Sequence, residues 1–164
     1  MGADEAESLT IRDAGPGDLA AIREMLLEYQ RWVGVDLSFQ GFAHEVARLP
    51  GDYAPPDGAL LIARRGLEAA GMVALRRLDE TRGEMKRLFV RTSARGTGVG
   101  RELVARIVDE ARTRGYQSIV LDTLPNMQSA QRMYEQFGFR DVPPYYQSAI
   151  PGTRYLALAL TRSP

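Results

Sequence analysis

The stretch Arg95-Gly96-Thr97-Gly98-Val99-Gly100-Arg101 decides the fold of this chain. It follows a strand-like segment and opens the clearest helix pattern in the sequence. Its alternating glycines permit left-handed backbone angles and allow a ligand to approach the main chain closely. The amino terminus of a helix presents unpaired N–H groups and the positive end of the helix dipole. We therefore predict a cradle for a pyrophosphate, to which the side chains of Arg91, Arg95 and Arg101 add positive charge.

The segments on either side of this stretch alternate between strand and helix patterns. Before it, 84–90 is predicted to be a strand. After it, apolar residues between 100 and 111 recur on one helical face until Gly115 ends the helix. The segment 117–121 is rich in Ile, Val and Leu, which is typical of a buried strand. A strand, a helix and a second strand in this order predict a right-handed parallel crossover.

The remaining segments complete one domain over residues 1–164, of which 1–8 are expected to be disordered. Asp18 is predicted to cap the first helix. The other predicted elements are a strand at 9–12, helices at 19–33 and 39–49, an antiparallel hairpin of strands at 59–63 and 72–78, a helix from Asn126 to Phe137, and strands at 139–142 and 155–160. The order β-α-α-β-β-β-α-β-α-β-β predicts an α/β fold (an α+β mixed sheet) with helices on both faces.

The composition is that of a soluble globular protein and excludes several kinds of site. Apolar residues make up 45% of the chain and charged residues 26%. The 21 Lys and Arg balance the 21 Asp and Glu, so we expect neither nucleic acid nor a membrane as partner. The absence of cysteine excludes a thiol nucleophile and a disulfide framework, and His44 alone cannot form a multi-histidine zinc site, so no metal is expected. The chain has no signal-peptide pattern, and a cytoplasmic location is expected.

Other nucleotide-binding folds compete for the glycine-rich stretch. A Walker loop is absent. A Rossmann fingerprint counted from Gly96 would need its last glycine at Arg101, although Asp122, about twenty residues further on, mimics the ribose-binding acid of that fold. A methyltransferase loop would have an acidic residue near its start, where this chain has Ala94. Both folds need more βα units than remain after Asp122, so a dinucleotide-binding domain is the weaker alternative.

These features together resemble the GNAT superfamily of N-acetyltransferases. The family signature, Gln/Arg-x-x-Gly-x-Gly/Ala, is matched by residues 95–100, and the preceding strand 84–90 fits the family pattern. Asn126, Ala130, Tyr134 and the segment 137–139 also match in order and spacing. The resemblance covers nearly the whole chain, most strongly 84–139, and implies the GNAT fold and acetyl-CoA as co-substrate.

The resemblance implies three groups of donor-binding residues. Backbone groups of Leu88, Phe89 and Val90, beside a bulge of the family strand, would pair with the pantetheine arm. The pyrophosphate would be held by Arg95 and by the amides of Gly96, Thr97, Gly98, Val99, Gly100 and Arg101. Asn126 would bond to the pantetheine, and the helix bearing Ala130 would lie along it. The strands 84–90 and 117–121 would separate at their ends to admit the donor.

The resemblance also implies two catalytic residues. Tyr134 would be the general acid near the departing sulfur. Its phenol pKa of about 10 lies above the value of about 8.5 for a thiol, so donation of the proton is uphill but possible at short range. Glu84 would be the general base, directly or through water. Each residue also has a purely structural interpretation: Tyr134 as part of the apolar stripe of its helix, and Glu84 as a partner of Lys86 or Arg87. Because the chain has no cysteine, direct transfer in a ternary complex is favoured over an acyl-enzyme.

In this family the acceptor pocket is built by the first two helices and by the loop between the last two strands. These segments contain Tyr29, Trp32, Asp36, Phe39, Tyr145 and Tyr146. Aromatic rings with an acid suit a cationic amine, carried by a small molecule or a protein. Tyr29 and Trp32 fit the core equally well, and the loop 143–146 fits a dimer contact, so a homodimer is an open alternative. A module that senses acetyl-CoA without turnover is the competing function.

Overall fold

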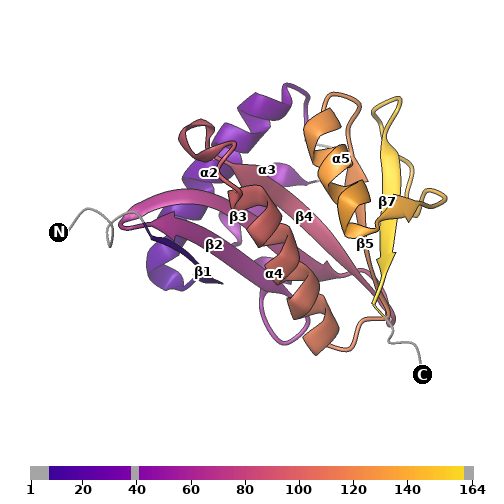
Figure 1. Cartoon of the computed structure of the whole chain (residues 1–164), viewed down its shortest axis with the longest axis horizontal. Helices are drawn as coiled ribbons and strands as arrows, with labels where there is room; N and C mark the ends of the chain where they lie inside the picture. Colours follow the sequence, from indigo (N-terminus) through magenta and orange to yellow (C-terminus); the bar gives the residue numbers. More distant parts are fainter. Residues whose placement is uncertain (1–7, 38–40, 161–164) are drawn as a thin grey trace.

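The computed structural model describes residues 8–37 and 41–160 (Figure 1). Its seven strands form one mixed sheet in the order β1-β2-β3-β4-β5-β7-β6. They are β1 (Leu9–Asp13), β2 (Ala59–Arg65), β3 (Glu68–Arg77), β4 (Arg82–Val90), β5 (Ser118–Thr123), β6 (Arg140–Asp141) and β7 (Arg154–Ala159). The helices are α2 (Leu19–Val33), α3 (Phe42–Ala47), α4 (Val99–Thr113) and α5 (Gln128–Phe137). Strands and helices follow one another in the predicted order, and the mixed α/β fold is confirmed.

Helices cover both faces of the sheet. Figure 1 shows α4 and α5 in front of it and α2 and α3 behind it. The front core includes Leu103 and Ile107 of α4, packed on Leu61 of β2 and Leu121 of β5. The rear core includes Ile22 and Met25 of α2, packed on Ile62 of β2 and Met72 of β3. Each central strand therefore places apolar side chains on both faces in alternation.

The amino-terminal half shows two differences from the predicted elements. Asp18 is at the predicted N-cap position of α2, but its side chain makes no capping hydrogen bond, since its carboxylate instead accepts hydrogen bonds from the guanidinium groups of Arg12 and Arg64 and from the Gly15 N–H. Helix α3 ends at Ala47, short of the predicted end at 49, because Pro50 disfavours helical angles in the residue before it. Phe39, at the start of the predicted helix 39–49, lies outside the described residues. The segment 1–7, most of the part expected to be disordered, also lies outside them.

The sheet has one parallel junction, between β4 and β5. The two strands pair only where Arg82, Gly83 and Glu84 face Ser118, Ile119 and Val120, and beyond that point they separate. The pairs β1–β2, β2–β3, β3–β4, β5–β7 and β6–β7 are antiparallel, which confirms the predicted hairpin of β2 and β3. A dinucleotide-binding fold needs several parallel βα units, and the strands described here contain one. That alternative is therefore wrong.

A β-bulge in β4 determines which side chains reach the junction. Met72 pairs with Phe89 and Ala74 with Lys86, so β4 has one more residue than β3 between these pairs. Arg87 lies in this bulge with φ of 60°, the one non-glycine residue with positive φ among those described. Strict alternation would put Lys86 and Arg87 on opposite faces of β4. The bulge instead brings both to the wall of one cavity.

Candidate active site

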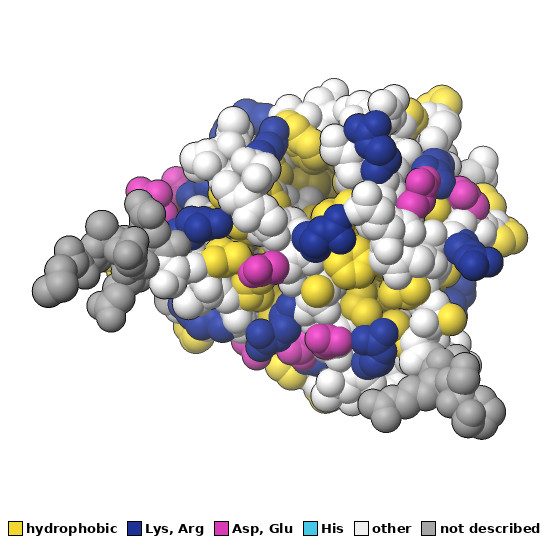
Figure 2. Space-filling view, viewed as in Figure 1, with side chains coloured by type: hydrophobic (Ala, Val, Ile, Leu, Met, Phe, Trp, Pro, Cys, Tyr) yellow, Lys and Arg dark blue, Asp and Glu magenta, His cyan; other side chains and the backbone are white. Residues whose placement is uncertain are grey.

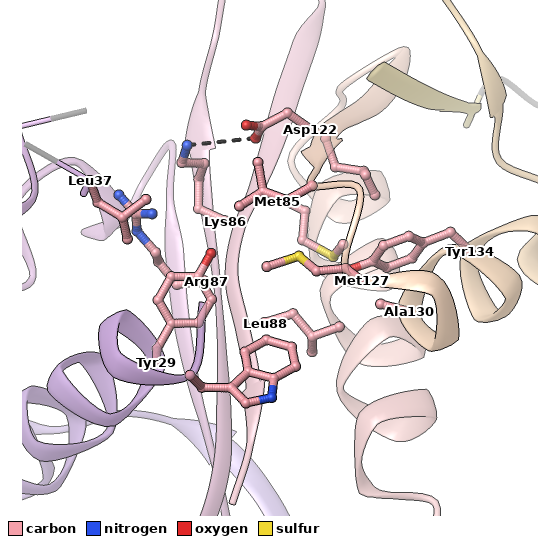
Figure 3. A pocket seen from close by; sticks show the side chains of 13 residues that line it. Tyr29, Leu37, Met85, Lys86, Arg87, Leu88, Asp122, Met127, Ala130 and Tyr134 are labelled. Carbon is pink, nitrogen blue, oxygen red and sulfur yellow. Dashed lines mark ion pairs between the residues drawn. The ribbon is translucent and has the colours of Figure 1, made fainter. Parts of the chain in front are cut away.

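A narrow cleft of about 50 Å³ opens where β4 and β5 separate. Figure 3 shows Tyr134 of α5 on one side of β4 and Tyr29 of α2 on the other. The lining residues are Tyr29, Trp32, Leu37, Met85, Lys86, Arg87, Leu88, Leu121, Asp122, Leu124, Met127, Ala130 and Tyr134. The predicted separation of the two strands is thus present. It brings together five of the residues singled out from the sequence, namely Tyr29, Trp32, Leu88, Ala130 and Tyr134.

The glycine-rich loop lies between the end of β4 and the start of α4. Gly96 and Gly98 have φ of 76° and 87°, in the left-handed region that glycine adopts without strain. A Cβ atom at either position would have no neighbour within 4 Å, so this part of the loop is open. A Cβ atom at Gly100 would lie 3.5 Å from Val90 and 3.8 Å from Met133, which places the start of α4 against β4 and α5.

The surface around this junction is hollow and carries basic side chains. Figure 2 shows a hollow on this face, with hydrophobic side chains inside it and Lys or Arg side chains near its rim. The guanidinium of Arg95 lies 5.0 Å from the centre of the Trp32 ring and donates to the Val90 carbonyl at 3.0 Å. A backbone cradle at a helix start together with a nearby guanidinium suits a phosphate group.

Other residues of the predicted donor site point elsewhere. Arg101 donates to Gln136 of α5 and lies over the Phe137 ring. Arg91 forms an ion pair of 2.8 Å with Glu28 of α2. Phe89 packs in the rear core, against Tyr29 and Trp32. Of the loop residues, Thr97 donates its hydroxyl to the Ala94 carbonyl, and Val99 is buried as the first residue of α4.

Asn126, which was expected to bind the pantetheine arm, does not line the cleft. Its side-chain amide donates to the Val33 carbonyl at 3.3 Å, which joins the start of α5 to the end of α2. Helix α5 begins at Gln128, two residues later than predicted, and Met127 lines the cleft where Asn126 was expected.

Tyr134 is 6% exposed and lines the cleft from α5. Its ring lies 5.7 Å from that of Phe139 in the front core. Burial raises the pKa of the Tyr134 phenol, because the phenolate would be poorly solvated there. The hydroxyl therefore stays protonated at neutral pH, which is the state that a proton donor requires.

Glu84 lies at the last paired position of the junction and is 1% exposed. Its Oε1 accepts from Arg76 at 2.7 Å and its Oε2 from the Tyr145 hydroxyl at 2.6 Å. Glu84 also lines a second cavity of about 560 Å³, which shares Lys86 and Arg87 with the cleft. This volume lies within the range of about 300–1,000 Å³ typical of small-molecule sites.

The loop between β6 and β7 forms part of the wall of the second cavity. Tyr146 lines it and donates to Asp122 Oδ2 at 2.6 Å. The structure thus brings Tyr145 and Tyr146 to the two carboxylates of the junction. Asp36 is exposed and lines neither of the two cavities, and Phe39 lies outside the described residues.

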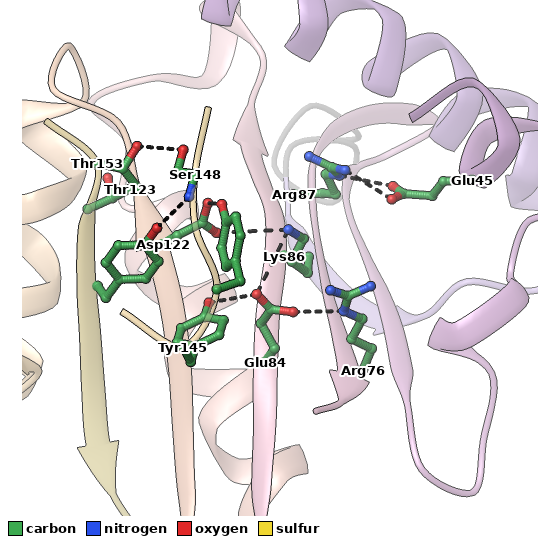
Figure 4. Close-up of polar contacts among 12 residues, drawn as sticks. Glu45, Arg76, Glu84, Lys86, Arg87, Asp122, Thr123, Tyr145, Ser148 and Thr153 are labelled. Carbon is green, nitrogen blue, oxygen red and sulfur yellow. Dashed lines mark hydrogen bonds and ion pairs between the residues drawn. The ribbon is translucent and has the colours of Figure 1, made fainter. Parts of the chain in front are cut away.

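The sequence analysis considered a pairing of Glu84 with Lys86, which the structure shows, but it missed the larger charged network around this pair (Figure 4). Lys86 Nζ lies 3.8 Å from Asp122 Oδ1 and 3.9 Å from Glu84 Oε2. Arg87 holds Glu45 of α3 in a two-pronged ion pair at 2.9 and 3.0 Å. The signal in the sequence that could have indicated this network is the pair Lys86 and Arg87, two basic residues in a strand whose other residues are mostly apolar. Within 8–37 and 41–160, no three His, Asp or Glu side chains come together as a metal site would need.

The chain is similar in sequence to known proteins. The sequence model of the Acetyltransferase (GNAT) family matches residues 19–139. An uncharacterized N-acetyltransferase of Schizosaccharomyces pombe is 38% identical over 149 residues, which are 90% of this chain and 91% of the relative.

Solved structures share the fold. A GNAT-family acetyltransferase from Staphylococcus aureus has a TM-score of 0.78 at 20% identity, over 94% of this chain and 100% of the other. An acetyltransferase from Salmonella typhimurium, solved with its cofactor acetyl-CoA, has a TM-score of 0.67 at 23% identity, over 94% of this chain and 95% of the other. No helix in the described part of the chain is long and apolar enough to cross a membrane.

Proposed function

Because this chain belongs to the acetyltransferase (GNAT) family and is an acetyl-CoA-dependent N-acetyltransferase, we propose that it transfers the acetyl group to a primary amine by direct attack in a ternary complex. One observation carries the proposal. The cleft contains Tyr134 on its wall and shares Lys86 and Arg87 with a second cavity that Glu84 lines. Residues of β4 and α5 line it, and the glycine-rich start of α4 packs against these same two elements. Acetyl-CoA would bind in the cleft between β4 and β5, and the amine would reach it through the second cavity.

The residues at the junction fit the donor. The open glycines at 96 and 98 and the amides at the start of α4 suit the pyrophosphate, with Arg95 close by. The bulge at Arg87 interrupts the ladder between β3 and β4, so backbone groups around Leu88 can pair with the amides of the pantetheine arm. Ala130 gives this arm a small neighbour on α5. Asn126 and Arg101 would have to leave their contacts with Val33 and Gln136 to take part.

The reaction moves two protons. The attacking amine must lose a proton, and Glu84 accepts this proton. Arg76 and Tyr145 hold the Glu84 carboxylate at the edge of the second cavity, where the amine would bind. The nitrogen forms a bond with the thioester carbonyl carbon, the carbon–sulfur bond breaks, and coenzyme A leaves as a thiolate. Tyr134 gives its hydroxyl proton to this thiolate. The absence of cysteine favours this direct transfer over an acyl-enzyme.

The experiment that tests the donor site is the thermal stability of the purified protein with one ligand at a time: acetyl-CoA, coenzyme A, NAD or S-adenosylmethionine. A ligand that binds only the folded state stabilises it by about 2.7 kcal/mol at a hundredfold excess over its dissociation constant. We expect the melting temperature to rise by a few degrees with the two coenzyme A species. A rise with NAD or S-adenosylmethionine alone would contradict the proposal. Thiol release with a panel of amines then distinguishes an enzyme from a sensor.

A further inference from the structure

Lys86 is the only lysine in the chain; the other 20 of its 21 basic residues are arginines. It occurs in β4, next to the bulge, and its side chain is 7% exposed. It lines both the cleft that contains Tyr134 and the cavity that Glu84 lines. The chain thus has one compact ammonium group, at the point where donor and acceptor would meet. Lysine differs from arginine in being a point charge with three freely directed N–H groups.

The carboxylates around Lys86 each have hydrogen-bond donors of their own. Glu84 is held by Arg76 and Tyr145, and Asp122 accepts from Tyr146. Glu45, further along the wall of the second cavity, is held by Arg87.

Lys86 itself forms ion pairs with two carboxylates but no hydrogen bond with either of them. The separations of 3.8 Å from Asp122 and 3.9 Å from Glu84 exceed the roughly 2.7–3.2 Å of an N–H···O hydrogen bond. Figure 4 shows its Nζ between these two carboxylates, and no hydrogen bond joins it to a described residue. The two ion pairs offset part of the cost of burying this ammonium group, and an oxygen partner within hydrogen-bond distance would stabilise it further. An anionic group entering the second cavity would supply that partner.

We propose that Lys86 binds the carboxylate of the acceptor, so that the acceptor is a free amino acid, an amine with a carboxylate close to its amino group. This inference rests on the proposed function and names the substrate class of the same site. The charges fit an amino acid: Glu84, which lines this cavity, would lie beside the amino group, and Lys86 would lie beside the carboxylate. Three cations (Arg76, Lys86 and Arg87) and two carboxylates (Glu45 and Glu84) line the second cavity, so it favours an anionic group over a polyamine.

The titration of Lys86 gives a direct readout of binding. Burial lowers the pKa of its ammonium group, and the charges of Asp122 and Glu84 oppose this effect. A carboxylate bound at Nζ would raise that pKa. Because the chain has a single lysine, protein labelled with lysine carrying carbon-13 at Cε gives one signal, which can be followed by NMR without turnover.

The first experiment titrates this signal with amino acids and with the amines that lack only the carboxylate: phenylalanine against 2-phenylethylamine, histidine against histamine, and lysine against cadaverine. The inference predicts that, with coenzyme A bound, at least one amino acid shifts the Cε signal and raises its titration midpoint. Its decarboxylated partner leaves both unchanged. Equal shifts with both members of every pair, or shifts with none of the amino acids, would overturn the inference.

The second experiment compares Lys86→Met and Lys86→Arg with Arg112→Met, a control at an exposed position of α4. All twenty amino acids and the three decarboxylated amines are screened by thiol release. For Lys86→Met we expect the KM of the best amino acid to rise by about tenfold to a hundredfold, with the control unchanged. Retained protection by coenzyme A shows that each variant is folded. Turnover of the decarboxylated amines alone would overturn the role of Lys86 and leave the proposed function intact. Coenzyme A binding without turnover of any amine would contradict the proposed function itself.

Discussion

The Tyr145 hydroxyl donates a hydrogen bond of 2.6 Å to Oε2 of Glu84, which ties the loop between β6 and β7 to β4. The next residue, Tyr146, makes the equivalent contact with Asp122 of β5. Both tyrosine rings also lie edge-on to Tyr155 of β7, with ring centres 5.4 Å apart. One loop thereby fixes the carboxylates on both strands of the junction.

The variant Tyr145→Phe removes the hydroxyl that Glu84 Oε2 accepts. Because Glu84 is buried, we expect the free energy of unfolding to fall by about 1–2 kcal/mol, measured by urea denaturation. The KM of the acceptor should rise, with the affinity for acetyl-CoA unchanged. Tyr116→Phe is the matched control, since it removes a similar hydrogen bond, of 2.7 Å to the Asp57 carbonyl, away from both cavities. An acceptor KM that changes equally in both variants would contradict this role of Tyr145.

The variant Gly98→Ala tests the glycine-rich loop. Gly98 has φ of 87°, which costs a residue with a Cβ atom about 1–2 kcal/mol. We expect either this loss of stability or a rearranged loop, and in both cases weaker binding of acetyl-CoA by calorimetry. Gly17→Ala is the control, because Gly17 has as much free space without a positive φ. Unchanged affinity in Gly98→Ala would show that the loop does not hold the donor.

Asp18 makes stability depend on pH. The hydrogen bond from Arg12 holds the pKa of the Asp18 carboxyl well below its usual value, with help from the Gly15 N–H and Arg64. Since the pKa is lower in the folded state, the stabilisation is complete above the unfolded pKa of about 3.9 and is lost as the pH falls through the folded pKa.

We therefore expect Asp18→Asn to lower the free energy of unfolding by about 1–3 kcal/mol at pH 7. The difference from the wild type should shrink as the pH falls below about 4. Thermal unfolding at pH 7 and at pH 3 measures both effects. Asp109→Asn is the control, because its side chain is 70% exposed. If the difference in stability between Asp18→Asn and the wild type is the same at both pH values, Asp18 is not the source of the pH dependence.

The sequence was sufficient to predict most of the fold, because the strand, glycine loop and helix at 84–113 follow local rules. The positive φ angles of Gly96 and Gly98 are what the alternating glycines predict. The face that Arg87 occupies could not be predicted, since it depends on a bulge defined by pairing with β3. The same holds for the Lys86–Asp122 contact, whose partners are far apart in the chain. Asn126 matches the family motif, yet its contact with Val33 depends on where α2 ends.

The most direct test of the central claim is the rate of thiol release by Tyr134→Phe at saturating acetyl-CoA and amine. The phenylalanine ring preserves the packing against Phe139 and removes only the hydroxyl. If Tyr134 protonates the leaving thiolate, kcat should fall by about a hundredfold or more, with the dissociation constant of acetyl-CoA within about twofold of the wild type. A variant that turns over at the wild-type rate would show that Tyr134 only packs, and that the cleft between β4 and β5 does not use it as an acid.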